Sequence, residues 1–292
     1  MKKLITTCED IKDIQMYKEA GADALCFALE GCSFSVLKEI RTEELEETVK
    51  AVHAADMEIR ILMNRLFMQK EIQDAQRKLD LVMTSGADAA VFADPGLLYY
   101  GLRKGYAGKM IYRSETMTTS SNDMHWFLNL GLGNVMVSPL LTEEEIICIA
   151  EKTEGCGIMI HGYLPESISR RTLVSAFGRS RGIEGLEEKR DLVLKELKRE
   201  GLMPVCEKDF GTIIHTDFVQ ESFRFIGRFA DAGVSCFEIN GEYLPKEAVR
   251  DAAEAYRAIL NGADGGMIGD AYCAKWAELP MENGYYGQKT VR

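Results

Sequence analysis

The chain has 292 residues, of which 46% are hydrophobic and 28% are charged, and its formal net charge at pH 7 is -11. This composition is typical of a globular protein with room for one large domain. The negative charge argues against nonspecific binding to nucleic acid or to an anionic membrane. The amino-terminal residues MKKLITTCEDIKD turn acidic before a signal-peptide core develops, and no apolar run reaches the roughly 20 residues that span a bilayer, so we expect a cytoplasmic protein.

One unit recurs along the chain: a helical pattern ends at a glycine and runs into a short apolar segment. It is found in EAGADALCFAL (19–29), TSGADAAVFAD (84–94), NLGLGNVMVSP (129–139) and DAGVSCFEING (231–241). In each copy the glycine can take the left-handed conformation that ends a helix, and the apolar run is typical of a buried parallel strand. The repetition predicts a chain of βα units.

Eight strands are predicted on this basis, at 4–8, 23–29, 58–64, 88–93, 109–113, 134–138, 156–161 and 234–240. Amphipathic helical segments such as 42–55 and 142–153 lie between them, and Thr142 with Glu145 forms a capping-box pattern at the start of the second. Eight strand-helix units predict an α/β fold, a (β/α)8 barrel of the TIM type, with an open doubly wound sheet as the alternative.

The spacing breaks only between the seventh and eighth strands, where residues 162–233 are too long for one crossover helix. We expect this insertion to contain a basic loop, a charged amphipathic helix at 184–199 and a short strand pair within 203–219. We therefore predict a single barrel domain over 1–292. Its insertion would lie on the face where barrel enzymes hold their active sites.

Polar side chains follow nearly every predicted strand, and in a parallel barrel these ends meet at one face. The side chains are Thr7, Cys8, Glu30, Cys32, Asn64, Arg65, Asp94, Ser114, Glu115, Ser138, His161, Asn240 and Glu242. From this ring we take Glu30, Asp94, Glu115, His161 and Glu242 as candidate catalytic residues, and Asn64, Arg65 and Asn240 as candidate ligand contacts. The alternative for each residue is that it caps a helix or anchors a loop.

His161 ends the apolar run GIMI, and an imidazole there could act as a general acid and base or as a metal ligand. The alternative is a histidine that holds the loop through its two nitrogens. His215, with Glu30, Glu115 and Glu242, could join it, but no recognised metal-ligand spacing is present. We therefore predict no metal site.

Four arginines crowd the segment after His161: Arg170, Arg171, Arg179 and Arg181. Because guanidinium groups bind carboxylates and phosphates in bidentate fashion, the cluster predicts a small anionic ligand. The alternative is that these arginines form ion pairs with Glu184, Glu187 and Glu188.

Several motifs also carry a family resemblance: AGADALCFAL (20–29), DPGLL (94–98), IHGYLP (160–165), GEYLPKEAVRDAAEAYRAIL (241–260) and NGYYGQ (283–288). The chain resembles the peptidase U32 family, the collagenase-like proteases. Its length and IHGYLP motif are most similar to the short members that act in oxygen-independent hydroxylation of the ubiquinone ring. Other members are implicated in hydroxylating tRNA or ribosomal RNA bases.

The resemblance implies a small anionic or nucleotide ligand, or an RNA-derived substrate. It leaves two alternatives: a U32-type peptidase, for which no nucleophile motif is readable, and a non-catalytic subunit that pairs with a cluster-bearing U32 relative.

The resemblance also implies an iron-sulfur cluster whose ligands this chain mostly lacks. Cys32, in EGCS, resembles the first cluster ligand, but the position of the second is Thr172, and RSRGIEGLEEKRD (179–191) contains no cysteine. A cubane cluster generally takes four thiolates, so we predict that a family-type [4Fe-4S] cluster is absent. Asn240-Gly241-Glu242 also replaces the family's Glu-Gly-Arg, which inverts a local charge. Whether Cys8, Cys32 and Cys206 converge is left open.

Overall fold

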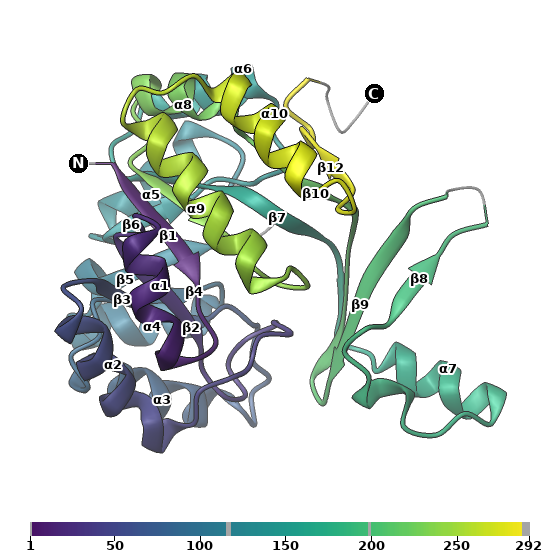
Figure 1. Ribbon diagram of the computed structural model, residues 1–292. Helices are drawn as coiled ribbons and strands as arrows, with labels where there is room; N and C mark the ends of the chain where they lie inside the picture. Colours follow the sequence, from purple (N-terminus) through teal and green to yellow (C-terminus); the bar gives the residue numbers. More distant parts are fainter. Residues whose placement is uncertain (1, 115–117, 198–199, 288–292) are drawn as a thin grey trace.

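The computed structural model describes residues 2–114, 118–197 and 200–287. Its centre is a closed barrel of eight parallel strands, in which β1 to β7 pair in sequence order and β11 pairs with both β7 and β1 (Figure 1). The strands are β1 (Lys3–Thr7), β2 (Ala24–Ala28), β3 (Glu58–Met63), β4 (Ala89–Phe92), β5 (Met110–Arg113), β6 (Asn134–Met136), β7 (Cys156–Ser169) and β11 (Cys236–Ile239). The predicted barrel and its eight strands are confirmed.

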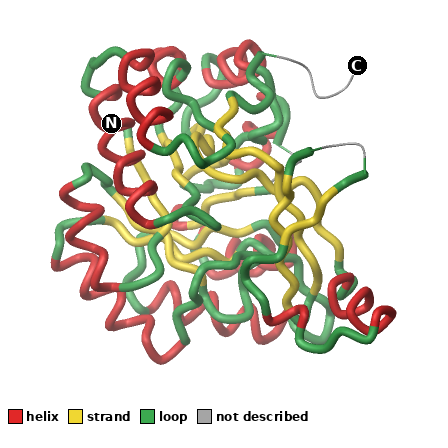
Figure 2. Tube along the Cα trace, turned by 45° about the vertical axis from the view of Figure 1, so that its right-hand side comes forward, coloured by secondary structure: helices red, strands yellow, loops and turns green. Residues whose placement is uncertain are grey.

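Helices surround the barrel (Figure 2), as the amphipathic segments between the strands predict. They are α1 (Ile14–Glu19), α2 (Leu45–Ala54), α3 (Ile72–Thr84), α4 (Pro95–Lys104), α5 (Ser121–Asn129), α6 (Glu143–Ala150), α8 (Ile226–Ala232), α9 (Lys246–Leu260) and α10 (Gly265–Lys275). Short 3-10 turns occupy Ile11–Asp13, Thr42–Glu44, Ala107–Lys109 and Leu186–Glu188. In the described part of the chain no helix has the length and apolar character needed to cross a membrane.

Local sequence signals set these boundaries. The Thr142–Glu145 capping box begins α6, with the Glu145 amide donating to Thr142 Oγ1 and the Thr142 amide donating to Glu145 Oε2. The glycines of the repeated unit all have left-handed backbone torsions: φ is 88° at Gly21, 92° at Gly86, 88° at Gly131 and 113° at Gly233. Because a side chain is strained in this conformation, glycine is the residue that lets each helix turn into the next strand.

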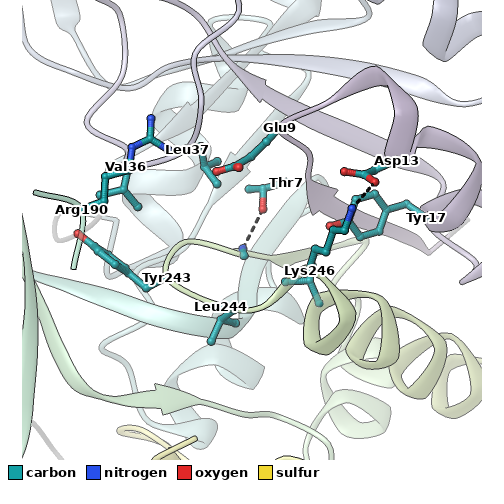
Figure 3. Close-up of a pocket in the computed structure, with 12 residues that line it drawn as sticks. Thr7, Glu9, Asp13, Tyr17, Val36, Leu37, Arg190, Tyr243, Leu244 and Lys246 are labelled. Atoms are coloured by element: carbon teal, nitrogen blue, oxygen red, sulfur yellow. Dashed lines mark hydrogen bonds and ion pairs between the residues drawn. The ribbon is translucent and has the colours of Figure 1, made fainter.

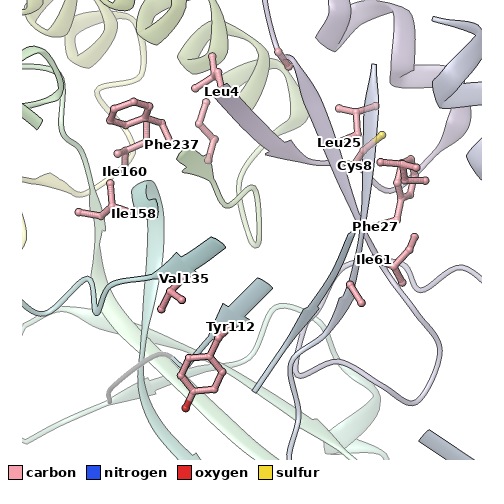
Figure 4. Packing of buried hydrophobic residues seen from close by; sticks show 14 of the residues in the cluster. Leu4, Cys8, Leu25, Phe27, Ile61, Tyr112, Val135, Ile158, Ile160 and Phe237 are labelled. Atoms are coloured by element: carbon pink, nitrogen blue, oxygen red, sulfur yellow. The ribbon is translucent and has the colours of Figure 1, made fainter. Parts of the chain in front are cut away.

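Alternating residues of the strands build two core layers. Ile5, Leu62 and Ile111 belong to a buried cluster inside the barrel, and Leu37 from the loop after β2 packs with the same cluster. The larger cluster lies between the strands and the helices; Figure 4 shows part of it, including Phe27. The barrel interior is therefore filled with side chains, among them the buried ion pair between Arg113 of β5 and Glu238 of β11.

The predicted insertion folds largely into an arm, which we define as residues 162–220. The second half of β7 leaves the barrel and pairs antiparallel with β10 (Gly211–Gln220), which pairs with β9 (Leu202–Lys208), and β9 with β8 (Val193–Lys195). The arm projects from the barrel and carries α7 (Leu173–Arg181) at its far end (Figure 1). The short strand β12 (Met281–Glu282) pairs with the barrel-side end of β10.

Two expectations for the insertion need correction. The strand pair within 203–219 is confirmed as β9 and β10, but the segment after His161 is a continued strand followed by α7, and not a loop. The helix predicted at 184–199 is wrong, because its described part holds a 3-10 turn and β8. Gly185 is left-handed, with φ of 66°, and Val193 and Leu194 pair with β9, so the apolar residues that suggested a helix join a sheet edge.

Candidate functional site

The carboxyl ends of the barrel strands form the mouth from which the arm rises. Asp94, predicted to be catalytic, accepts hydrogen bonds there from the amides of Gly96 (2.6 Å) and Leu97 (3.0 Å), and so caps α4. Its second oxygen accepts from the amide of Phe67 at 2.9 Å. Each of these bonds is to the backbone, so the carboxylate anchors two loops at the mouth.

Arg65, predicted to contact a ligand, is buried and bonded to its own surroundings. Its Nε donates to the carbonyl of Gly31 at 2.7 Å, and its Nη1 lies 3.2 Å from Glu71 Oε1. The guanidinium also lies 4.4 Å from the ring centre of Phe67 and 4.1 Å from that of Phe210, which belongs to the arm. Arg65 therefore ties the arm to the barrel.

Glu30 and Asn64 are each held by a neighbouring hydroxyl group. Glu30 Oε1 accepts from Thr42 Oγ1 at 2.6 Å, and this bond is the main cause of the lowered pKa of the Glu30 carboxyl. Asn64 Oδ1 accepts from Ser33 Oγ at 2.9 Å. Glu115, the remaining predicted acid of the early strands, lies outside the described residues.

His161 faces away from the barrel interior. Its ring lies between β7 and helices α9 and α10, with Nδ1 3.3 Å from the Tyr256 hydroxyl and Nε2 3.2 Å from the Tyr272 hydroxyl. Burial lowers the pKa of His161 to about 3, so the imidazole is neutral at physiological pH. These surroundings are those of a histidine that joins β7 to two helices.

Glu242 has a different environment, because β10 of the arm brings His215 to it. His215 Nε2 lies 3.3 Å from Glu242 Oε2, and both side chains are buried. Burial is the largest influence on the Glu242 carboxyl and acts to raise its pKa, but His215, Ser35 and Arg113 outweigh it and the pKa is lowered. An ionised carboxylate therefore orients an imidazole at the end of β11, where Asn240 Oδ1 accepts from the Glu242 amide at 3.2 Å.

Tyr243 completes this buried cluster. Its ring centre is 5.0 Å from that of His215, and it is one of two described non-glycine residues with positive φ, at 61°. Such a conformation is strained for an aromatic residue and recurs at binding sites. Among the described residues, His215 Nδ1 and the Tyr243 hydroxyl have no hydrogen-bond partner. Glu242 Oε2 is likewise without a hydrogen-bond partner among the described residues, so its contact with His215 Nε2 is one of charge. An imidazole with one nitrogen beside a carboxylate and the other available can exchange a proton with a ligand.

A cavity of about 380 Å³ opens beside Tyr243, where β1 and β11 end (Figure 3). Arg190 of the arm and Tyr243 lie at one side of it, and Lys246 lies at the other. Lys246 Nζ is 3.0 Å from Asp13 Oδ1, and Glu9 also lines the cavity. Two cations, two carboxylates and two aromatic rings, those of Tyr17 and Tyr243, thus surround a space of ligand size.

The amino terminus of α9 reaches the same cavity through Lys246, its first residue. Its N-cap, Pro245, gives no side-chain hydrogen bond to the helix amides. A helix of 15 residues with an uncapped amino terminus offers amide donors and partial positive charge to an anion. The geometry therefore favours a ligand that carries both an anionic group and hydrogen-bond donors.

The four arginines predicted to bind an anion line no part of this cavity. Arg170 lies 3.8 Å from Glu71, and Arg181 lies 5.7 Å from the ring centre of Phe177. Both arginines, with Arg171 and Arg179, are exposed on the arm. They form a basic surface on and before α7, separate from the cavity.

Sequence reasoning named Glu242, Asn240 and, as a possible companion, His215, but it missed Tyr243, Arg190 and Lys246. No local pattern marks Arg190, because only the fold of the arm carries it to the barrel. Lys246 follows Pro245 at the start of a clear helical pattern, which was the one available signal for it.

The thiols are placed poorly for a metal cluster. Burial raises the pKa of Cys8 and of Cys32 to about 12 and that of Cys206 to about 11, so each is protonated at neutral pH. Within the described residues no three His, Cys, Asp or Glu side chains gather in a way that could hold a metal ion. Cys8, Cys32 and Cys206, whose convergence the sequence left open, therefore form no such group among the described residues.

Comparison with known proteins gives one family match over most of the chain. The model of Peptidase family U32 matches residues 9–290. The solved structure titled "The Structure of the U32 Peptidase Mk0906" superposes with a TM-score of 0.51 at 18% identity, covering 82% of this chain and 92% of that one. At this identity the likeness shows a shared fold, the TIM-type barrel.

Curated relatives come from two bacteria. The chain is 23% identical over 268 residues to tRNA hydroxylation protein P2 of Bacillus subtilis (strain 168), covering 89% of this chain and 87% of that protein. It is 23% identical over 257 residues to 23S rRNA 5-hydroxycytidine C2501 synthase of Escherichia coli (strain K12), but spans only 38% of that protein. It is 25% identical over 183 residues to tRNA hydroxylation protein P of the same organism, spanning 39% of it.

Proposed function

Because the chain belongs to Peptidase family U32, we propose that it acts in the hydroxylation of an RNA base and binds a nucleotide at the mouth of its barrel. The observation that carries this proposal is the similarity to a protein named for tRNA hydroxylation along nearly the whole of both chains.

The chemistry of the cavity beside Tyr243 supports a nucleotide ligand. A nucleotide carries a phosphate group, which Arg190, Lys246 and the amino terminus of α9 can bind. It also carries ribose hydroxyl groups, which can donate hydrogen bonds to the Glu9 carboxylate. Its base presents a flat face to an aromatic ring such as Tyr243. A bare inorganic anion would offer the Glu9 carboxylate no hydrogen-bond donor, whereas a ribose would, so the mixed lining favours the nucleotide.

The Glu242–His215 pair supplies the proton chemistry in this proposal. Glu242 Oε2 lies 3.3 Å from His215 Nε2 and favours a proton there by its charge, and His215 Nδ1 is the atom that gives or takes a proton. Tyr243, in contact with His215 and part of the cavity wall, connects the pair to the bound nucleotide.

We also propose that this chain does its part without a family-type [4Fe-4S] cluster. Cys32 is the one cysteine that matches the family pattern, and its thiol is buried with a pKa of about 12. The oxidising equivalents for hydroxylation must then come from another component, which leads to the second candidate below.

The test is the nucleoside content of tRNA and rRNA from the host lacking this gene. Mass spectrometry should show one hydroxylated nucleoside reduced, restored by the wild-type gene and by Lys50→Gln, but only weakly by Lys246→Gln or His215→Gln. Lys50 is an exposed lysine of α2 and serves as the charge-matched control. Unchanged nucleosides, or full restoration by both site variants, would contradict the proposal.

A second candidate, a non-catalytic subunit that pairs with a cluster-bearing U32 relative, is favoured by the surface of the arm. Eight of the fifteen exposed large hydrophobic side chains among the described residues lie on it: Ile168, Leu173, Phe177, Ile183, Val193, Leu194, Leu197 and Leu202. Apolar residues gathered in this way are typical of a protein interface. We expect Phe177→Asp, but not Met267→Asp on the exposed start of α10, to abolish co-purification with a co-expressed cluster-bearing U32 protein of the same host.

The peptidase alternative has less support. The buried thiols of Cys8 and Cys32 are protonated, and a protonated thiol is a weak nucleophile. Cleavage of a peptide library that an inhibitor blocks, and that the His215→Gln variant no longer performs, would support the peptidase alternative.

A further inference from the structure

We infer that the barrel has a second binding site at its other mouth, for a small monocarboxylate that bears a hydroxyl group. A cavity of about 360 Å³ lies there, lined by the amino-terminal ends of β1, β3, β6 and β11 among others. It is on the opposite side of the filled barrel core from the nucleotide site proposed above, and the inference does not depend on that proposal.

Arg60 of β3 is the main reason to expect an anion. It lines the cavity and is only 4% exposed, yet the partner of its Nη2 is the thiol of Cys236, at 3.0 Å. Its Nη1 has no hydrogen-bond partner among the described residues. Burial acts to lower the pKa of Arg60, but Cys236 and the charge of buried Glu238 outweigh it and the pKa is raised. Nη1 is still left without a partner in a buried place, which is costly, and a ligand carboxylate could accept a hydrogen bond from it.

Asn134 adds a requirement for a hydrogen-bond donor. It also lines the cavity, and its Oδ1 is buried without a partner among the described residues. A Cβ added to Gly157 would lie 2.4 Å from Met136 Sδ, 2.7 Å from this oxygen and 3.0 Å from Cys236 Cβ. Asn134 therefore lies close to Cys236, the partner of Arg60. A hydroxyl group on the ligand would satisfy Asn134 while the carboxylate binds Arg60.

The other charged groups of the cavity limit the ligand to one negative charge. Lys3 forms an ion pair with Glu58, and Asp88 accepts from the Ile59 amide at 2.8 Å and lies 2.9 Å from His53 Nε2. Arg60 is thus the one cation here that no acidic group pairs with, within the described residues, while Glu58 and Asp88 would repel a dianion such as a phosphate.

Gly108 offers a way to close the cavity without touching Arg60. It lines the cavity, and a Cβ added to it would meet no heavy atom within 4 Å. Phenylalanine at this position is therefore expected to fold normally and to occupy part of the cavity.

The experiment is isothermal titration of the full chain with glycolate, which has one carboxylate and one hydroxyl group. We expect saturable binding of glycolate, weaker binding of acetate and none of ethylene glycol. Arg60→Met and Gly108→Phe should each weaken glycolate binding about tenfold or more, while Arg77→Gln, on the exposed face of α3, should leave it unchanged.

Gly108→Phe keeps the test decisive if Arg60→Met does not fold. The inference is overturned if the wild-type chain shows no saturable binding of glycolate, or if binding survives both variants. Because Lys246 and His215 lie at the opposite mouth, loss of RNA modification in their variants bears only on the nucleotide site, and the two proposals fail independently.

Discussion

Burial fixes the protonation state of His161. The ring has its two nitrogens beside the hydroxyls of Tyr256 and Tyr272 and packs against Phe223, in a space that water does not reach. Strict alternation along β7 would place His161 on the same side as Met159, inside the barrel. A β-bulge between Met159 and His161 turns it outward, and no residue pattern in the sequence marks that bulge.

We expect His161 to make the protein less stable in mild acid. Its pKa is about 3 in the folded protein against 6.5 for an ordinary histidine, so below pH 6.5 the unfolded chain takes up a proton that the folded chain does not. Stability is therefore lost as the pH falls, by about 1.6 kcal/mol between pH 6.5 and 5.0. Urea unfolding at these two pH values should show this loss in the wild-type protein and a smaller one in His161→Gln.

His125→Gln, at an exposed histidine of α5, is the matched control and should lose stability with pH as the wild type does. The assignment fails if His161→Gln and the wild type lose equal stability between the two pH values.

At the scale of elements, signals confined to a few neighbouring residues were predictive. The capping box at Thr142 and the left-handed glycines mark helix ends, and apolar runs of four to six residues mark strands, because these features depend on the local backbone. The arm was less predictable, since β8 becomes a strand only by pairing with β9. The contact of His215 with Glu242 depends on the same long-range pairing.

Asp94 is expected to stabilise the start of α4 and not to contact the substrate. Its carboxylate caps α4 and holds the Phe67 amide, so Asp94→Ala should lower the free energy of unfolding by about 2 kcal/mol. Asn is also a good N-cap, so Asp94→Asn should keep most of the stability and the RNA modification. Urea unfolding and nucleoside analysis of the complemented strain measure both effects.

Asp74→Ala, at an exposed acid in the first turn of α3, controls for loss of a helix-terminal charge. If the Asp94→Asn protein is stable but does not support RNA modification, Asp94 is a catalytic residue and not only a helix cap.

For the whole molecule, the distribution of charge decides how a large anion can approach. The chain has a net charge of -11, yet residues 169–182 contain four arginines and no acidic residue. These arginines are exposed on the arm, and none of them lines the cavity beside Tyr243. A tRNA repelled by the rest of the surface would therefore make its first contacts at α7, while one of its nucleotides reaches the barrel mouth.

This arrangement predicts that Arg170→Ala combined with Arg171→Ala weakens tRNA binding without unfolding the protein. Each lost phosphate contact means that about one counterion fewer is released on binding. The slope of log affinity against log salt concentration should therefore become less negative by roughly 1 to 2. Fluorescence anisotropy with labelled tRNA at several salt concentrations measures this slope, and thermal melting checks the fold. Arg224→Ala with Arg228→Ala removes the same charge from exposed arginines outside the arm and should leave the slope unchanged. Equal slopes for the wild type and the Arg170, Arg171 variant would mean that the basic surface of the arm does not contact the RNA, because counterion release counts phosphate contacts irrespective of base sequence.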